Sequence, residues 1–208
     1  MSLTNAAISA FLQAGVLGGA PFLAYIVYQQ LRHKRTLQES ARRSGLQVGN
    51  PRYLVHSLAF ALLGAGLIVL VFAVWPTSLE PFTREGSAQR QFVGLGFGVS
   101  AMALAFLKGV VQTGFAEELL FRGLIAGSLS RHLPFVWANV AQAFIFLVPH
   151  FHILLVMPEM WPILPLVFLG ALTFGWVRIK SGSILGSWLM HGTGNVTMAL
   201  IVAIRTTV

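Results

Sequence analysis

The 208-residue sequence contains no cysteine and no aspartate, and its only acidic residues are six glutamates. Without cysteine the chain forms no disulfide, carries no thiolate nucleophile and offers no thiolate ligand to a metal. Without aspartate it has no pair of catalytic aspartates. The sequence also lacks the His-Glu-x-x-His pattern of zinc-binding helices and the Gly-x-Ser-x-Gly pattern of a nucleophilic serine. These absences disfavour cysteine, aspartyl, zinc-helix and serine chemistry.

Charged residues are also scarce: they make up 10% of the chain, whereas hydrophobic residues make up 56% and the mean hydropathy is +0.76. Several windows of about 20 residues contain almost no charge, and a helix of this length crosses a bilayer. The sequence therefore predicts an all-α, polytopic membrane helical bundle that forms a single domain over residues 1–208. We expect about seven transmembrane helices, at about 6–30, 54–75, 92–113, 115–131, 135–149, 161–179 and 183–204. The N-terminus has no basic n-region, so we expect the first span to be retained.

The net charge of +8 does not indicate a nucleic-acid partner, because the basic residues cluster beside apolar spans, where anionic lipid attracts them. The segment from Arg32 to Tyr53 carries six Lys or Arg residues against Glu39 alone, which predicts that this first basic loop is cytoplasmic and the N-terminus outside. With seven spans, eight of the fourteen Lys and Arg residues, Lys108 among them, fall at inside ends, and Arg122 is intramembrane. The outside ends then carry five: Arg84, Arg90, Arg131, Arg178 and Lys180.

The polar centre of the sequence is Glu117-Glu118-Leu119-Leu120-Phe121-Arg122, which lies in apolar surroundings where charges are costly and usually functional or paired. On a helix Glu118 and Arg122 are spaced i,i+4 in the favourable order for an ion pair. Glu117 lies about 100° further round the axis, so it is left free of that pair. We assign Glu118 and Arg122 a supporting role and Glu117 a chemical one. The alternative is a buried ion-pair network without chemistry.

Three further polar residues are expected to approach Glu117. The predicted span 135–149 leads to His150, and His191 and Asn195 share one face of the span 183–204 at i,i+4. In the seven-span topology Glu117 and His150 lie at the cytoplasmic end, and the last span runs toward that end. We therefore expect four polar groups from three spans to meet at one depth. His152 is the alternative to His150 as the histidine that approaches Glu117, and we interpret it as a loop residue.

These residue types together suit hydrolysis of an amide inside the membrane. A carboxylate in low-dielectric surroundings is a general base for water, and a histidine holds the water or protonates the leaving amine. A histidine and an asparagine on one helix face can donate hydrogen bonds to a developing oxyanion.

Three motifs occur in this order along the chain: Glu117-Glu118-x-x-x-Arg122, Phe146-x-x-x-His150 and His191-x-x-x-Asn195. Together they resemble the CPBP family, the type II CAAX prenyl endopeptidases and their bacterial relatives, some of which are linked to bacteriocin processing or self-immunity. The resemblance implies a glutamate-dependent intramembrane endopeptidase with a catalytic core at about 92–205, acting on a membrane-associated peptide or protein. It implies that Glu117 and His150 activate water and that His191 and Asn195 stabilise the oxyanion, with Phe146 in support. It also implies an integral protein of the bacterial inner membrane.

Two other classes of function and one other mechanism stay open at the level of sequence. The chain could be a non-proteolytic membrane scaffold or immunity protein, or a small transporter with Glu117 and the histidines as a proton relay. A zinc ion held by Glu117, His150 and His191 would replace the general base. We expect no metal cofactor, because Glu118 is committed to Arg122, no further carboxylate supports the histidines, and Asn195 suits an oxyanion donor better than a ligand.

Overall fold

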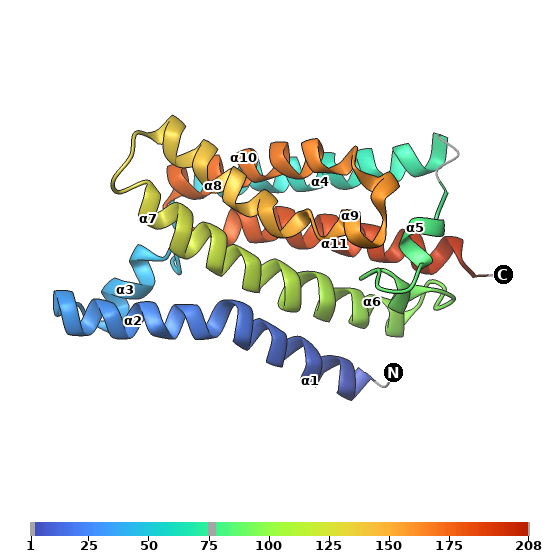
Figure 1. The fold of residues 1–208 in the computed structure, drawn as a ribbon, viewed down its shortest axis with the longest axis horizontal. Helices are drawn as coiled ribbons and strands as arrows, with labels where there is room; N and C mark the ends of the chain where they lie inside the picture. Colours follow the sequence, from blue (N-terminus) through green and yellow to red (C-terminus); the bar gives the residue numbers. More distant parts are fainter. Residues whose placement is uncertain (1–2, 75–77, 208) are drawn as a thin grey trace.

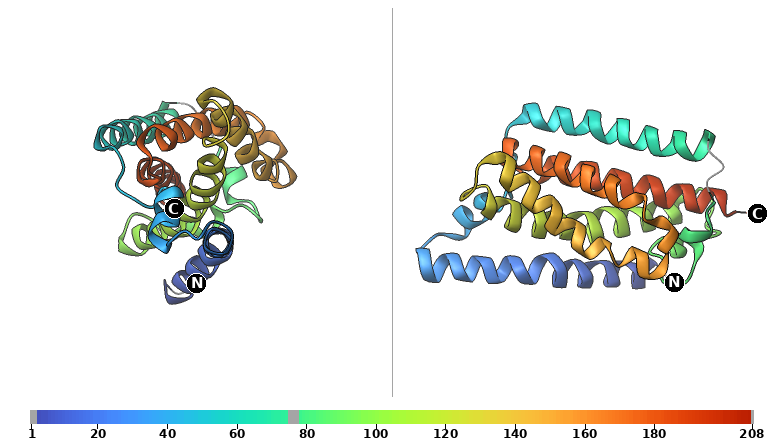
Figure 2. Two further views of the ribbon diagram at one scale, coloured as in Figure 1. Left: turned by 90° about the vertical axis from the view of Figure 1, so that its left-hand side faces the viewer. Right: turned by 45° about the horizontal axis from the view of Figure 1, so that its top comes forward.

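The computed structural model of the protein describes residues 3–74 and 78–207, and in this part of the chain six helices are long and apolar enough to cross a membrane. The chain is thus an integral membrane protein with a helical membrane bundle, as its composition predicts. The helices run side by side (Figures 1 and 2). The spanning helices are α1–η1–α2 (Leu3–Ala14, Gly15–Gly19, Ala20–His33), α4 (Pro51–Val74), α6–η3–η4–α7 (Val99–Ala105, Phe106–Phe115, Glu118–Ala126, Gly127–Leu129), α8–α9 (Phe135–His150, Ile153–Val156), α10 (Ile163–Ser181) and α11 (Leu185–Arg205). The short helices between them are α3 (Leu37–Arg43), α5 (Glu80–Thr83), η2 (Arg90–Phe92) and η5 (Pro158–Met160).

The described residues contain six spans rather than about seven, because the predicted spans 92–113 and 115–131 belong to one helix, Val99–Leu129. Gly114, the residue between the two predicted spans, does not break this helix. A β-carbon there would lie 2.7 Å from the Gly109 backbone oxygen of the same helix, so the helix leaves no room for a side chain, whereas Trp188 at 3.4 Å and Gly192 at 3.5 Å would be in ordinary contact with it. The helix also begins later than predicted, after a loop in which Gly94 and Gly96 have positive φ angles of 73° and 66°.

The loss of one span changes which charges share a membrane face. Arg131 and Arg178 both donate to the backbone oxygen of Arg43, at 3.4 and 3.1 Å, so they lie at the end of the bundle that carries the first basic loop. Lys180 also belongs to this end, where its Nζ lies 4.6 Å from the centroid of the Phe135 ring. The prediction that these three cations lie at the opposite end from the first loop was wrong.

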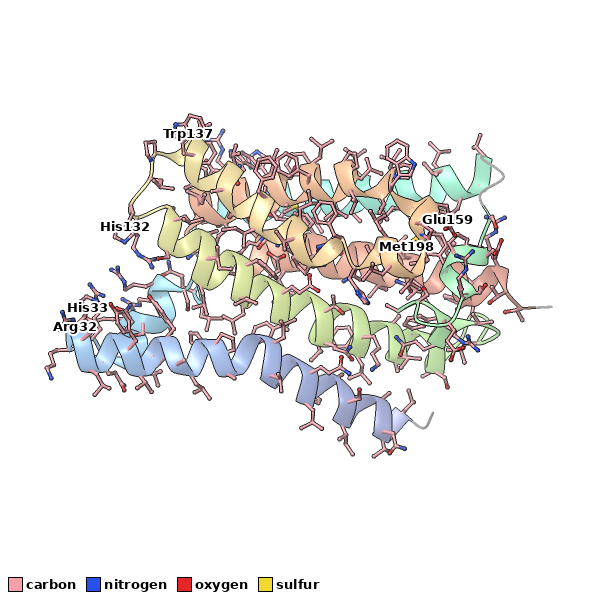
Figure 3. The ribbon with its side chains drawn as sticks, in the orientation of Figure 1. Arg32, His33, His132, Trp137, Glu159 and Met198 are labelled. Atoms are coloured by element: carbon pink, nitrogen blue, oxygen red, sulfur yellow. The ribbon has the colours of Figure 1, made fainter. Side chains whose placement is uncertain are left out.

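We call this face the basic end; it carries nine of the fourteen Lys and Arg residues. Figure 3 shows Arg32, His33, His132 and Trp137 toward this face and Glu159 toward the other. The opposite end has Arg84, Arg90 and Arg205 and three glutamates, and Arg84 pairs there with Glu80 at 2.8 Å and Glu159 at 3.0 Å. Lys108 is not an end residue: it is buried within the bundle and donates to Gln112 at 2.7 Å and Ser9 at 3.3 Å.

Small residues set how closely the helices pack. One buried cluster joins α1, α6 and α11 through alanines, and a second joins η4, α8 and α10 around Phe121 and Phe146. Small side chains allow close backbone contact where lipid supplies no hydrophobic drive for association. The remaining large apolar side chains are mostly exposed, as expected of helices that face lipid. The polar centre of the molecule lies against the second cluster, because the Phe146 ring packs on Arg122.

Candidate functional site

The predicted pair of Glu118 and Arg122 forms, with 3.1 Å between Glu118 Oε1 and Arg122 Nη1 and both side chains fully buried. Aromatic rings surround the cation: the Arg122 guanidinium carbon lies 3.9 Å from the Phe146 centroid and 5.3 Å from that of Phe174. The negative ring faces stabilise a cation that has lost its water. The pair therefore joins η4 to α8 and α10 in the middle of the bundle.

His191 was expected to approach Glu117, but its hydrogen bond to Glu118 was not expected from the motifs. Its Nδ1 lies 3.0 Å from Glu118 Oε1, and its Nε2 lies 3.9 Å from Glu117 Oε2. A carboxylate accepts hydrogen bonds, so Glu118 holds the tautomer in which Nδ1 carries a proton. Glu118 thereby neutralises Arg122 and also orients His191, with its Nε2 directed toward Glu117.

Glu117 differs from Glu118 in its surroundings. Its side chain is 18% exposed, whereas that of Glu118 is fully buried. Glu117 Oε2 is buried without a hydrogen-bond partner. The side chain also lines a groove of about 430 Å³ between the first and third spanning helices, together with Leu12, Gln13, Val16, Leu17, Gln112 and Thr113. Of the two carboxylates, Glu117 is the one open to a molecule entering from outside.

The local helix geometry separates the two glutamates. Residues Phe106–Phe115 and Glu118–Ala126 are π-helical, and Glu117 lies at the junction between them. π-Helical turns occur mostly as short insertions and frequently at functional sites. The i,i+4 spacing predicted the ion pair, but the wider turns that set the position of Glu117 have no signature in the apolar pattern.

His150 is joined to the polar centre through Phe146. Its Nδ1 lies 2.8 Å from the Phe146 backbone oxygen, which only accepts, so Nδ1 donates and Nε2 is left as an acceptor. The two rings pack at 4.5 Å between centroids, and the Phe146 ring lies 6.1 Å from that of His191. His152 is exposed in the turn after α8, as its interpretation as a loop residue predicts.

The direction of the helices that carry these histidines was predicted wrongly. Helix α8 starts at the basic end, and His150 is its last residue, on the side away from that end. Helix α11 also runs away from the basic end. Both reversals follow from the single helix Val99–Leu129, in which Glu117 lies in the interior and not at an end. His191 and the Phe146–His150 pair still approach the glutamates. Reversing the direction of a helix changes the depth of a residue little when that residue lies near the middle of the membrane.

Asn195 lies on the same face of α11 as His191, one turn further on. Its Nδ2 donates to the Gly109 backbone oxygen at 3.3 Å. A β-carbon on Gly109 would lie 3.0 Å from Asn195 Cβ, so the helices touch here. Gly109 precedes Glu117 by eight residues, about two turns earlier on the same helix. Asn195 therefore contacts the groove-lining helix below Glu117, with one of its two amide hydrogens engaged.

Phe174 was missed by the sequence analysis. Its ring lies 5.7 Å from the His191 ring and 5.3 Å from the Arg122 guanidinium. It comes from α10, which carries none of the three motifs, and one aromatic residue among many in an apolar span gives no signal. Only the packing of α10 against η4 and α11 reveals its place.

The donor set does not fit a preformed metal site. Within residues 3–74 and 78–207, no group of three His, Asp or Glu side chains stands close enough to hold one ion. The alternative ligand set of Glu117, His150 and His191 is thus not assembled. His150 is separated from the other two by the Phe146 ring, which both histidines contact.

The comparison with known proteins agrees with the motifs. The model of the family "Type II CAAX prenyl endopeptidase Rce1-like" matches residues 99–197. This stretch starts at the first residue of α6 and includes all the residues of the polar centre. No curated protein and no solved structure matches the chain. The part of the chain that holds Glu117, His150, His191 and Asn195 is thus similar to the Rce1-like type II CAAX prenyl endopeptidases.

Proposed function

We propose that the protein is an intramembrane endopeptidase in which Glu117 activates the water that hydrolyses a peptide bond of a membrane-associated substrate. The observation that carries this proposal is the contrast between the two glutamates. Each glutamate has a buried Oε2 without a hydrogen-bond partner, but Glu118 is fully buried and is committed through Oε1 to Arg122 and His191, whereas Glu117 is partly exposed and lines a groove. A carboxylate with few hydrogen-bond donors is a good acceptor for a proton of water.

In the proposed reaction Glu117 takes a proton from the water as the water oxygen bonds to the scissile carbonyl carbon. The carbonyl oxygen then carries the negative charge, and the hydrogen-bond donors that stabilise it lower the barrier. We assign this role to His191, which donates from Nε2 when both of its ring nitrogens are protonated, and to the second amide hydrogen of Asn195. The carbon–nitrogen bond breaks as the proton passes to the leaving amine, from Glu117 or by way of His150. The products are a carboxylate and an amine.

No step of this scheme requires a metal, and we propose that the enzyme works without one. His191 is oriented by Glu118 and has no need of a metal to fix its tautomer. Glu117 is spaced from His191 Nε2 by 3.9 Å, which leaves it free to bond to water.

We further propose that the basic end faces the cytoplasm. This end carries nine cations and the other end three, as the positive-inside rule expects of a cytoplasmic face. The membrane that we propose is the bacterial inner membrane. The groove beside Glu117 is lined by exposed apolar residues such as Leu12 and Val16, which supports entry of the substrate from the lipid. The substrate class that fits is a membrane-associated peptide or protein segment.

The test is a substrate trap based on Glu117→Gln, with Glu80→Gln as the matched control because Glu80 is an exposed glutamate far from the site. Each variant is crosslinked in native membranes, and the captured proteins are identified and offered to the parent enzyme in liposomes. We expect the parent and Glu80→Gln to cleave a protein that Glu117→Gln retains uncleaved. A Glu117→Gln protein that melts like the parent and cleaves at the parent rate would refute the proposal.

A further inference from the structure

Two arginine side chains converge at the basic end, away from the site of hydrolysis. Arg178 of α10 is buried, with 6% of its surface exposed, and its Nη2 donates to the Arg43 backbone oxygen at 3.1 Å. Arg131, in the turn between α7 and α8, is exposed, and its Nη1 donates to that same oxygen at 3.4 Å. Gly127 makes room for both guanidinium groups: a β-carbon there would lie 3.0 Å from Arg178 Nη2 and 3.5 Å from Arg131 Nη1.

Two more polar groups near this point lack hydrogen-bond partners. Arg43 Nε is buried without an acceptor, and the Tyr25 hydroxyl of α2 is buried without a partner. Tyr25 interacts electrostatically with both Arg131 and Arg178, which places it beside the two cations. We call Arg43, Arg131, Arg178 and Tyr25 the arginine cluster. Four segments of the chain contribute to it.

No anion of the described chain compensates this charge. None of the three arginines forms an ion pair among residues 3–74 and 78–207. Glu39 is the single acidic residue at the basic end, and its carboxylate accepts from the Thr36 backbone and hydroxyl. Burial lowers the pKa of Arg131, and the neighbouring charges of Arg43 and Arg35 lower it further. Guanidinium groups nevertheless stay protonated, so the cluster keeps its positive charge.

We propose that the arginine cluster is a binding site for a phosphate group. Guanidinium forks match phosphate oxygens bidentately, and a buried cation such as Arg178 favours an anion strongly because little water competes. The tyrosine hydroxyl supplies one further donor. The site lies at the level where phospholipid headgroups meet the basic end of a membrane bundle, so an anionic lipid headgroup is the source at hand. Free inorganic phosphate has the same chemistry and is separated from lipid by experiment.

The site has a direct link to the catalytic helix. Arg178 Nε donates to the Arg122 backbone oxygen at 3.0 Å, and the Arg122 side chain holds Glu118. A bound phosphate would relieve the repulsion between Arg131 and Arg178 and fix the corner where α3, η4 and α10 meet. The lipid would thus stabilise the half of the bundle that supports the polar centre.

The test measures the melting temperature of the delipidated full chain in neutral detergent. It compares additions of phosphatidylglycerol, phosphatidylcholine with the same acyl chains, and inorganic phosphate. The variants are Arg131→Gln, Arg131→Lys and the control Arg52→Gln, an exposed cation of the same end outside the cluster. Arg131 is chosen over Arg178 because its exposed side chain is less needed for folding.

We expect phosphatidylglycerol to raise the melting temperature with a saturable dependence that phosphatidylcholine lacks. Arg131→Gln should raise the lipid concentration at half-saturation about tenfold, as expected for the loss of one charge-assisted hydrogen bond. Arg131→Lys should raise this concentration less, and Arg52→Gln should leave it unchanged. If inorganic phosphate gives the same saturable shift with the same dependence on Arg131, the phosphate site is supported with a soluble ligand as its source. Equal shifts from both lipids, or equal losses in Arg131→Gln and Arg52→Gln, would overturn the proposal.

Discussion

Removal of Arg122 should be among the most damaging single changes to the stability of this protein. Arg122→Ala takes away the partner of Glu118, which is fully buried and 3.1 Å from the guanidinium. Breaking a buried pair in this way costs roughly 3–5 kcal/mol, because the remaining charge stays buried and uncompensated. His191 keeps its contact with Glu118 Oε1 at 3.0 Å, so we expect a loss in the lower half of that range.

The assay is thermal melting in detergent, with Arg84→Ala as the control. Arg84 also pairs with glutamates, but its side chain is 37% exposed, and ion pairs that are open to water contribute little to stability. At roughly 2–4 °C per kcal/mol for a chain of this size, Arg122→Ala should melt about 6–16 °C below the parent and Arg84→Ala within a few degrees of it.

A double variant separates the charge from the packing. Glu118→Gln combined with Arg122→Met removes both charges and keeps most of the volume, so it should melt above the single Arg122→Ala variant. The reasoning is refuted if Arg122→Ala is as stable as Arg84→Ala. An Arg122→Ala protein of parental stability that has lost cleavage would instead assign Arg122 a part in the reaction.

Three other outcomes are expected. His150→Ala should reduce the rate of cleavage by about 10²–10⁴-fold with little change in melting temperature, since the side chain is only partly buried and its hydrogen bond is to the backbone of its own helix; a loss of less than twofold would remove it from the reaction. Gly175→Ala should destabilise by about 1–3 kcal/mol, because a β-carbon there collides with the buried side chains of Asn139 and Gln142. Gly170→Ala, on the same helix with open space around it, should be within about 0.5 kcal/mol of the parent, and similar melting of the two variants would contradict this account. Active protein should contain no stoichiometric zinc by elemental analysis and should keep its activity after exhaustive chelation; zinc whose removal stops cleavage and whose return restores it would show the metal-free mechanism to be wrong.

Spacing along one helix was enough to predict the local part of the site. Glu118 and Arg122 are four residues apart in an apolar stretch, and the ion pair follows from that distance alone. Gly114 marks the limit of the same reasoning. A glycine between two apolar runs is compatible with a loop or with a continuous helix, and only the structure, with one helix from Val99 to Leu129, decides between them. Because a break was predicted at Gly114, the predicted direction of every later helix was opposite to the direction in the structure.

The other differences between the predicted and the observed site arise from contacts between helices, which a single sequence does not predict. The bridge of His191 between two glutamates depends on how α11 is rotated against the π-helical segments. The bond of Asn195 to Gly109 depends on the depth at which the two helices cross. The types of residue that surround Glu117 were therefore predictable, whereas their distances from it were not.

The even number of spans has a consequence for the two ends of the described chain. Residues 3 and 207 lie on the same side of the membrane, opposite the basic end, whereas seven spans would have separated them. With the basic end in the cytoplasm, a fluorescent protein fused to either terminus would be exported and remain dark in bacteria, and a periplasmic phosphatase fused there would be active. The same fusions in the loop near Arg131 would give the opposite signals. Reporters at these three positions thus show whether the number of spans is even or odd, and which compartment the arginine cluster faces.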